Sequence, residues 1–517
     1  MAKDPVARQR LVALLTAAGF AVAWHLWVGD AHLNPAEEGY LWYGTWRTGL
    51  GEIPVRDFQS YDPGRYYLCA ALAKVLGGGL LGLRRAEACV QGLGILFGLL
   101  AARRATRASW VLVPLGVVLG AWMFPRHKVF EGMVALACTW SGTRLLEHPT
   151  RRRHAAAGVT AGLAAVFGRN LGLYAAVALA LLAAVSAWKR RERGCARDGL
   201  ALAGGVVAGY APMLALMLLA PGFLAQFVES LRLLLRLGAN IEAPWLWPWR
   251  VELAGVGARE TLARICLALV YLLPVTVLPL GWLVLLRARA EELPRRAALG
   301  AAAVVGTLFL HHASVRSDAS HLAQSIQPTL VATAGLLALL AERRRALAAG
   351  LAVVLGLGAV DAAVEHNPAL NHVGRARLVS VQLGNERLRF LPQHADYYPR
   401  LLAALQRRVG PEERIFIAPS RPSFYALLGK RSPSWWIYFF VEGADEAEQA
   451  RLVAELEGVE WVLLVDHAIA EREGLRFPNS YPLVWAHVLA SYRRVPTPEL
   501  EPNHQLYRLR TAPGGER

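Results

Sequence analysis

Two adjacent glutamates follow the first hydrophobic run and are the groups in this chain best suited to chemistry. Glu37 and Glu38 stand in the segment 34–67, which also holds an aromatic run and the string 61–67 (YDPGRYY). A carboxylate placed where lipid meets water is costly, so its presence there indicates a site. Partial desolvation would raise the pKa of such a group towards the working pH and suit it to act as a general base.

The same glutamates also have a structural explanation. Asn34-Pro35 is a good helix cap, and acids in the first turn of a helix interact favourably with its dipole. Capping and catalysis can hold together. The residue types leave open which of Glu37 and Glu38 would be the base.

Basic groups gather on a later connection, 125–131 (PRHKVFE). Arg126, His127 and Lys128 could form a phosphate cradle there beside a second acid, Glu131. The alternative is an interfacial anchor whose long cations reach lipid headgroups. Glu131 fits the anchor less well, because it falls at the start of an apolar run, near hydrocarbon.

A third group combines the pair His311-His312 with Arg316, Asp318 and His321. Such a set can bind a divalent metal, but its spacing matches no specific signature. Pairing of Arg316 with Asp318, or phosphate binding by Arg316 with His321, is favoured instead. Arg169, between two apolar runs, is a lone cation that could serve the same purpose.

The rest of the chain has the composition of a membrane protein. Of its 517 residues 55% are hydrophobic, more than in most soluble domains. Apolar runs near 20 residues recur, the length that crosses a hydrocarbon core of about 30 Å. The net charge of +17 comes from arginine clusters between these runs, as the positive-inside rule predicts, so we expect no nucleic-acid binding.

We expect a polytopic α-helical membrane protein with about eleven spans, a cytoplasmic N-terminus and an extracytoplasmic C-terminal domain, because alternate connections such as 151–153 and 343–345 are strongly basic. The stretch 66–82 is apolar but broken by glycines, which favours a juxtamembrane or half-inserted helix over a span. The expected spans are 11–28, 86–102, 109–124, 129–146, 155–168, 171–188, 199–220, 260–286, 297–312, 322–341 and 346–364.

The composition changes after residue 364. We therefore divide the chain into a transmembrane module, 1–364, with an outer juxtamembrane loop, 29–85, and a mixed α/β domain, 365–517. Short apolar runs predict strands at 414–419, 459–466 and 505–510, separated by helical patterns near 395–408, 444–457 and 480–493. No glycine-rich phosphate loop is found in this domain.

These motifs resemble the polytopic GT-C glycosyltransferases, specifically the dolichyl-phosphate-mannose-protein mannosyltransferase-like group (glycosyltransferase family 39 type) and its bacterial relatives. Glu37-Glu38 resembles an Asp-Glu pair in that family's first outer loop, although the leading acid there is usually Asp. Glu131 lies where the family often has a second acid. The other strings that carry the resemblance are 51–58 (GEIPVRDF), 61–64 (YDPG), 169–174 (RNLGLY), 316–322 (RSDASHL) and 419–433 (PSRPSFYALLGKRSP).

The resemblance implies an inverting transfer of a sugar from a polyprenyl-phosphate carrier to a lipid, glycan or protein acceptor, at the outer face of a bacterial inner membrane. It implies catalytic roles for Glu37, Glu38 and Glu131. It implies lipid-phosphate binding by Arg126, Lys128, Arg169, Arg316 and His321, and sugar or acceptor binding by Tyr40, Asp57, Tyr61 and Asp62. No cofactor is implied with certainty, and a divalent metal stays possible.

Two other classes of function remain. A transporter or flippase of a lipid-linked or anionic substrate would also carry charges in its outer loops. Such a protein should have ionisable groups deep within its spans, and the deepest spans here are almost free of them. A non-catalytic scaffold would not need the loop from Glu37 to Tyr67.

Overall fold

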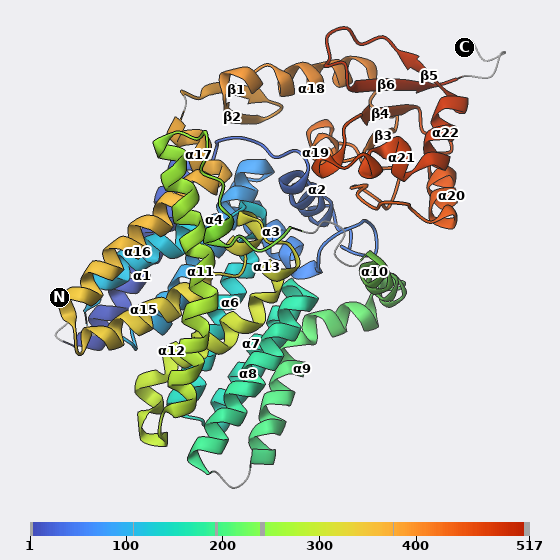
Figure 1. The fold of residues 1–517 in the computed structure, drawn as a ribbon. Coiled ribbons are helices and arrows are strands. Elements are labelled where there is room, and N and C mark those ends of the chain that lie inside the picture. The colour runs from blue at the N-terminus through green and yellow to red at the C-terminus, as the bar shows by residue number, and fades with distance from the viewer. Residues whose placement is uncertain (1–3, 107, 192–194, 238–242, 376, 511–517) are drawn as a thin grey trace. The chain divides into compact units, whose positions relative to one another are not determined.

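The computed structural model describes residues 4–106, 108–191, 195–237, 243–375 and 377–510 (Figure 1). Its contacts divide the chain into two compact units, each assembled from distant segments. The membrane unit comprises Met1–Gly29, Arg84–Ala220 and Glu242–Arg375, and the sheet unit comprises Asp30–Leu83, Pro221–Ile241 and Ala376–Arg517. The segment 34–67, which carries Glu37 and Glu38, therefore belongs to the same unit as the C-terminal residues.

The described residues include seven helices that are long and apolar enough to cross a bilayer, which confirms the expected polytopic helical class. Each overlaps one of the expected spans. Six are α1 (Pro5–Val28), α4 (Gly79–Ala102), α8 (Arg169–Arg190), α9 (Cys195–Leu219), α11 (Ala258–Arg287) and α16 (Arg345–His366). The seventh, Ala290–Ser314, joins α12 (Leu293–Phe309) to the start of α13 (His311–Val315).

The other four expected spans are bent or short. Helices α5 (Leu112–Ala121) and α6 (Val129–Glu147) belong to two consecutive segments, Ser109–Ala121 and Arg126–Glu147, which are long and apolar enough to cross a bilayer only when taken together. A bend of 106° separates the two segments. Helix α15 (Gln327–Ala341) has 15 residues and α7 (Arg151–Phe167) has 17. At about 1.5 Å per residue α7 covers roughly 25 Å, less than a full hydrocarbon core.

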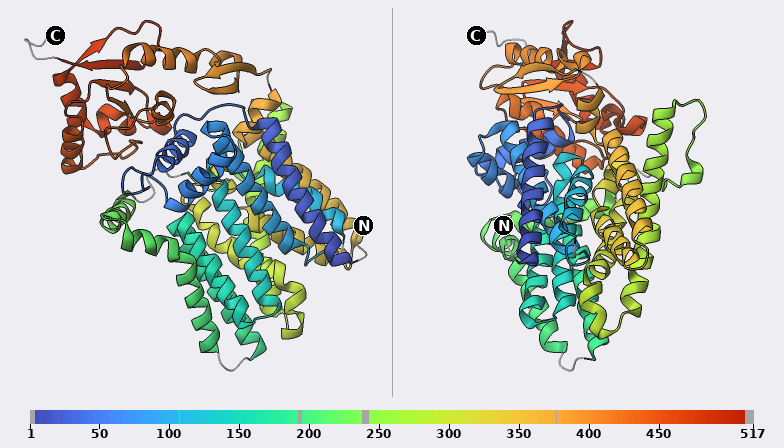
Figure 2. Two further views of the ribbon diagram at one scale, coloured as in Figure 1. Left: turned by 180° about the vertical axis from the view of Figure 1, so that it is seen from behind. Right: turned by 90° about the vertical axis from the view of Figure 1, so that its left-hand side faces the viewer.

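Helices α7, α8 and α9 run side by side in the membrane unit (Figure 1 and Figure 2). Glycines four residues apart allow the close approach of α7 and α9. A Cβ atom on Gly158 would lie 2.0 Å from the carbonyl oxygen of Leu202, and one on Gly209 would lie 2.3 Å from that of Val159. Small residues at this spacing let two helix backbones pack directly against each other.

The stretch 66–82 does not form a span of its own, as expected. Helix α3 (Pro63–Val75) has 13 residues. It ends before a turn in which Gly77, Gly78 and Gly79 all have positive φ, a conformation that favours glycine. Helix α4 then begins at Gly79, seven residues before the start that the sequence predicts.

A four-stranded sheet forms the core of the sheet unit, in the order β3-β4-β6-β5. Strands β3 (Ile415–Ala418) and β4 (Trp461–Val465) are parallel, and β6 (His504–Leu509) is antiparallel to β4. The expected strands and helices are confirmed, the helices as α18 (Tyr397–Arg408), α20 (Glu446–Glu455) and α22 (Pro482–Ser491). Strand β5 (Tyr492–Val495) and the hairpin of β1 (Val379–Leu383) and β2 (Glu386–Phe390) are additional.

Every residue of β3 and β4 is buried, as the continuous apolar runs IFIA and WVLLV predict for strands covered on both faces. Three further helices belong to the sheet unit. They are α2 (Glu37–Gly49), α10 (Phe223–Leu237) and α19 (Ser423–Leu428).

Candidate functional site

The two glutamates of α2 lie in different environments. Glu38 is only 2% exposed, whereas Glu37 is exposed. Ala36 occupies the N-cap position of α2, and the Asn34 side chain accepts hydrogen bonds from the backbone N–H groups of Ala36 and Glu37, so Asn34 supplies the cap bond from two residues before that position. Glu38 Oε2 accepts from the backbone N–H of Asn34 at 3.3 Å. The cap thus fixes the backbone of both acids while one is enclosed and the other faces solvent.

Residues from the C-terminal part of the chain hold the start of α2. The Tyr398 hydroxyl donates to the Leu33 carbonyl at 3.1 Å, and the Ser423 N–H donates to the Pro35 carbonyl. Gly39 packs so tightly on α19 that a Cβ atom there would lie 2.8 Å from the backbone nitrogen of Ser423. Ser423 belongs to the string 419–433, which the sequence motifs include. This string therefore packs directly against α2, the helix that carries Glu37 and Glu38.

The segment before α2 is also tied down. Asp30 accepts hydrogen bonds from the Arg389 guanidinium on β2, with Nε 2.8 Å from each carboxylate oxygen. The backbones of Asp30 and His32 bond to Arg389 as well, which adds this segment to the β1–β2 hairpin.

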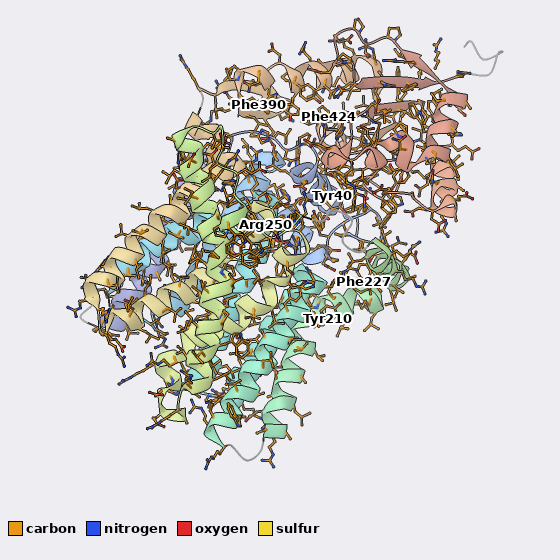
Figure 3. The ribbon with its side chains drawn as sticks, viewed as in Figure 1. Tyr40, Tyr210, Phe227, Arg250, Phe390 and Phe424 are labelled. Carbon is orange, nitrogen blue, oxygen red and sulfur yellow. The ribbon has the colours of Figure 1, made fainter. Side chains whose placement is uncertain are left out.

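Aromatic rings surround the next turn of α2. The Tyr40 ring packs edge-to-face on Tyr61 at 4.9 Å and on Tyr438 at 6.2 Å, between ring centroids. The Arg65 guanidinium lies over the Tyr61 ring at 5.0 Å. Figure 3 marks Tyr40 on α2 and Phe424 on α19. Tyr40 and Tyr61, both expected to contact sugar or acceptor, are thus brought together.

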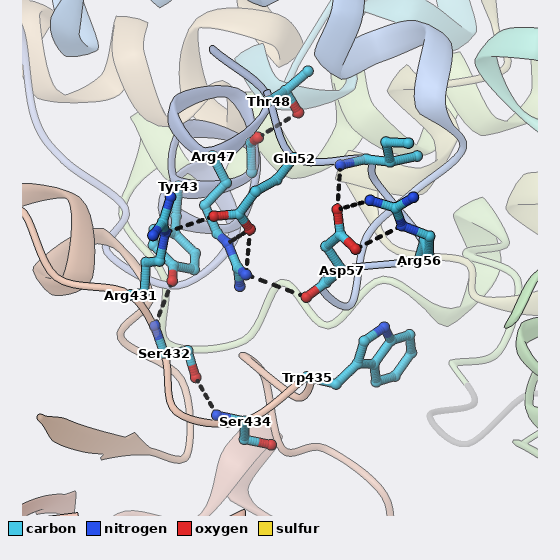
Figure 4. Close-up of polar contacts among 12 residues, drawn as sticks. Tyr43, Arg47, Thr48, Glu52, Arg56, Asp57, Arg431, Ser432, Ser434 and Trp435 are labelled. Carbon is cyan, nitrogen blue, oxygen red and sulfur yellow. Dashed lines mark hydrogen bonds and ion pairs between the residues drawn. The ribbon is translucent and has the colours of Figure 1, made fainter. Parts of the chain in front are cut away.

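Asp57 lies in an ion pair rather than among these rings (Figure 4). Both its oxygens accept from Arg56, and Oδ2 also accepts from the Ile53 N–H at 2.7 Å. Burial raises the pKa of Asp57, but the bonds from Arg56 and Ile53 outweigh burial and leave that pKa below its usual value. These contacts show that the Asp57 side chain stabilises the turn from Ile53 to Asp57. Asp62, 7% exposed, precedes α3.

A second network links the far end of α2 to the C-terminal residues. Arg47, 6% exposed, pairs with Glu52 and donates to the Asp57 carbonyl at 3.2 Å. Arg431 pairs with the other oxygen of Glu52 at 2.7 Å. The Tyr43 hydroxyl accepts from the Ser432 N–H, and burial raises the pKa of Tyr43 to about 12. Tyr43 is therefore a neutral structural group at physiological pH.

In the membrane unit, the expected phosphate cradle lies where α5 and α6 are broken. Three side-chain amides bond the last carbonyls of α5 and the residue after it: Gln91 to Gly120, Asn367 to Ala121, and Gln327 to Trp122. Gly120, Ala121 and Trp122 are buried, and a buried helix end needs such partners for its last carbonyls. Neutral amides thus cap the break.

The charged residues follow directly after this break. Arg126, His127 and Lys128 form one 3-10 turn, and Glu131 stands in the first turn of α6. Glu131 is 3% exposed and His127 is 1% exposed. Arg126 Nη2 donates to the Val28 carbonyl at 3.3 Å, which ties the turn to the end of α1.

The third group forms the expected ion pair. Arg316 Nε lies 2.7 Å from Asp318 Oδ2, and His321 Nδ1 lies 2.8 Å from Asp318 Oδ1. Asp318 also caps the short helix α14 (Ala319–Ala323) through the His321 N–H. Burial raises the pKa of Asp318, but His321 and Arg316 together hold it below its usual value.

His312 lies beside the third group. Its ring lies 5.6 Å from the His321 ring, and Nε2 is 2.9 Å from Gln324 Oε1. Arg169 stands on a separate connection, as the first residue of α8.

Within the described ranges, no three His, Cys, Asp or Glu side chains are arranged to hold a metal ion. Several positioning residues were not expected from the sequence, including Tyr398, Tyr438 and Gln324, the partner of His312. Gln91 and Gln327 did carry a signal, since each is a polar residue inside an apolar run.

No family model matches the chain, and no curated protein is similar to it in sequence. Among solved structures, the chain is similar to the crystal structure of ArnT from Cupriavidus metallidurans in the apo state. The similarity covers 95% of this chain and 97% of that one, at 15% sequence identity and a TM-score of 0.44. Values this low do not define a family, so the function proposed for this chain rests on its own residues.

Proposed function

We propose that this chain is an inverting glycosyltransferase of the GT-C type, which moves a sugar from a polyprenyl-phosphate carrier to an acceptor at the outer face of a bacterial inner membrane. The observation that carries the proposal is Glu38. It is a carboxylate with 2% exposure on a firmly held helix start, in a chain with seven membrane-length helices and in the loop whose motifs resemble that family.

Glu38 acts as the general base and Glu37 does not. Neighbouring positions on a helix point about 100° apart, so one acid can be enclosed while the next faces water. A carboxylate taken out of water holds a proton more readily, which suits it to accept one from a hydroxyl at neutral pH. An exposed acid such as Glu37 lacks that advantage.

In the proposed step, the acceptor hydroxyl loses its proton to Glu38 as its oxygen attacks the anomeric carbon. The bond from that carbon to the phosphate oxygen breaks on the opposite face, so the configuration inverts. The polyprenyl phosphate departs as an anion and needs charge stabilisation rather than a proton. Tyr40 and Tyr61, whose rings meet at 4.9 Å, would stack on the sugar, with Asp62 binding its hydroxyls.

The cations of the membrane unit stabilise the departing phosphate. Arg126 and Lys128, in one turn beside Glu131, are the first candidates. Arg169 is a further cation at a helix start. Arg316 is paired with Asp318, which also bonds His321, so the positive charge of Arg316 is partly balanced and its contribution is smaller. Glu131 would orient the acceptor.

Purified protein reconstituted in vesicles tests the proposal with a panel of polyprenyl-phosphate sugars. We expect release of polyprenyl phosphate with one donor, and NMR of the product should show inversion at the anomeric carbon. Glu38→Gln should lower kcat by about 10²- to 10⁴-fold, whereas Glu37→Gln should change it by no more than a few-fold. Both variants should keep the wild-type Tm.

The proposal fails if no donor in the panel is consumed. The assignment of the base fails if Glu37→Gln loses more activity than Glu38→Gln at equal Tm.

A further inference from the structure

The sheet unit contains a cavity of about 300 Å³ between α10 and α20. This volume lies at the lower end of pockets that hold small organic molecules. Its walls combine acids, arginines, amides and indoles: Gln226, Glu229, Ser230, Leu233, Arg236, Trp435, Trp436, Asp445, Ala447, Glu448, Arg451, Leu452 and Glu455.

Helix α10 presents two distinct faces. Gln226, Glu229, Ser230, Leu233 and Arg236 recur at helical spacing and line the cavity. Exposed apolar residues lie on the opposite face of the helix: Leu224 is 51% exposed, Val228 is 37% exposed and Leu235 is 84% exposed. A helix with one such apolar face suits the membrane surface. The cavity therefore lies on the polar side of a helix that can rest on lipid.

Polar contacts join the walls of the cavity. Arg236 on α10 lies 3.2 Å from Glu229 and 3.8 Å from Asp445, the residue that caps α20. Glu455 Oε2 accepts from the Ser434 hydroxyl at 2.6 Å. These contacts connect α10, α20 and the segment before Trp435 around the cavity.

Glu448 gives this cavity an unused acceptor. Its Oε1 is buried and has no hydrogen-bond partner among the described residues. Burial raises the pKa of Glu448 above its usual value, although Arg236 and Arg451 oppose that rise. A buried oxygen without a partner is costly, and a ligand hydroxyl would satisfy it.

The lining selects the chemistry of the ligand. Carboxylates outnumber guanidiniums four to two, which disfavours phosphates and other anions. Indole faces attract the C–H face of a sugar ring by dispersion, and carboxylates, amides and guanidiniums bond its hydroxyls. Trp435 and Trp436 stand at right angles with centroids 5.2 Å apart, so they offer two differently oriented surfaces.

We propose that this cavity binds an uncharged saccharide unit of the acceptor, which would make the acceptor a glycan or glycolipid. This inference rests on the proposed sugar transfer and deepens it. The loop that leads to Tyr61 is bonded to one residue of the lining: Trp435 Nε1 donates to the Val55 carbonyl at 3.0 Å, and the Trp435 carbonyl accepts from the Gln59 N–H at 2.8 Å.

Saturation-transfer NMR on the purified full chain tests the proposal without any donor. The probes are methyl glycosides of a hexose, an N-acetylhexosamine and a pentose, a short-chain alkyl glycoside in vesicles, and tetramethylammonium as a cation probe. At least one uncharged glycoside should bind. Glu448→Gln should weaken its binding at least tenfold, and Ala447→Trp, which fills the cavity, should abolish it.

The matched control is Glu446→Gln, an exposed acid on the same helix that does not line the cavity. It should bind the glycoside as the wild type does, and all variants should keep the wild-type Tm. Tighter binding of the alkyl glycoside, sensitive to the same two variants, would assign a membrane-anchored glycolipid. Equal affinity for both forms would assign a soluble glycan.

Three results would overturn the proposal: no glycoside binds, Glu448→Gln and Ala447→Trp bind it unchanged, or tetramethylammonium alone binds. Glu38→Gln separates this inference from the proposed reaction. That variant should bind the glycoside normally while it fails to transfer sugar, so loss of transfer and loss of binding are scored independently.

Discussion

The two units hold their charged groups in place by different means. In the sheet unit, the glutamate helix is held by partners far along the chain, since Tyr398 bonds Leu33 across 365 residues and Ser432 bonds Tyr43 across 389. In the membrane unit, neutral amides of neighbouring helices bond the backbone of the α5–α6 break. Glu37 and Glu38 thus depend on a folded C-terminal segment, whereas Arg126, Lys128 and Glu131 depend on helix packing.

The difference shows where each group is vulnerable. A change in the C-terminal residues should disturb the proposed base, because those residues hold α2 in place. A change at the α5–α6 break should disturb the cations that are proposed to bind phosphate.

The largest loss of stability is expected in the sheet unit at Arg47. The guanidinium is buried, pairs with Glu52 and lies over the Phe58 ring at 4.8 Å. In Arg47→Ala, Glu52 keeps Arg431 but loses its buried partner, while its own side chain is only 15% exposed. This loss should lower the free energy of unfolding by about 3 kcal/mol. Thermal unfolding in detergent measures the loss.

Arg431→Ala is the matched control, because Arg431 pairs with the same Glu52 but its side chain is 61% exposed. An exposed pair contributes little, so the cost should stay below about 1 kcal/mol. Equal losses for Arg47→Ala and Arg431→Ala would show that burial of the pair does not matter.

A smaller effect is expected where α2 rests on α19. In Gly39→Ala the new Cβ would lie 2.8 Å from the Ser423 nitrogen, so the helix must shift. Overpacking of this kind costs about 1–3 kcal/mol, and displacement of the neighbouring Glu38 should lower the transfer rate about tenfold. Activity and Tm measured on one preparation check both effects.

Gly49→Ala, on the same helix, is the control for the added methyl group. No atom lies within 4 Å of the position that a Cβ would take at Gly49, so stability and rate should stay near wild type. Similar loss in both variants would mean that contact with α19 does not position the acid.

The smallest effect is expected in the membrane unit at Asp318, whose carboxylate pairs with Arg316 and His321. Side chains about one third exposed make this pair worth roughly 1 kcal/mol. The pKa of Asp318 is lower in the folded chain than its unfolded value of about 3.9. The pair therefore stabilises the fold above that pH and stops doing so as pH falls through the folded pKa.

The Tm of wild type should exceed that of Asp318→Asn from pH 8 down to about pH 4, and the difference should close at lower pH. A difference that widens below pH 4 would contradict the depressed pKa of Asp318.

Much of the fold could be predicted because its causes are local. Apolar runs identified the long helices, and the cap at Asn34 lies within three residues of the helix it starts. The strands β3 and β4 follow from continuous apolar runs. The strand β5 (YRRV) was not predicted, because only its pairing with β6 distinguishes it from the end of the preceding helix.

The site could be predicted only in part. Residue types identified both glutamates, but the sequence cannot tell which is enclosed, because burial depends on segments hundreds of residues away. Tyr398 gave no signal for the same reason. Asp57 differs, because its partner is its neighbour in the sequence: Arg56 donates to both oxygens of the Asp57 carboxylate.

The proposed reaction depends above all on Glu38 as its general base, with Glu37 dispensable. The turnover of sugar transfer by Glu38→Gln and Glu37→Gln, measured side by side at equal Tm, tests this assignment. We predict that kcat falls by about 10²- to 10⁴-fold in Glu38→Gln and stays within a few-fold of wild type in Glu37→Gln. Wild-type turnover in Glu38→Gln, or an equal loss in both variants, would show that Glu38 is not the base.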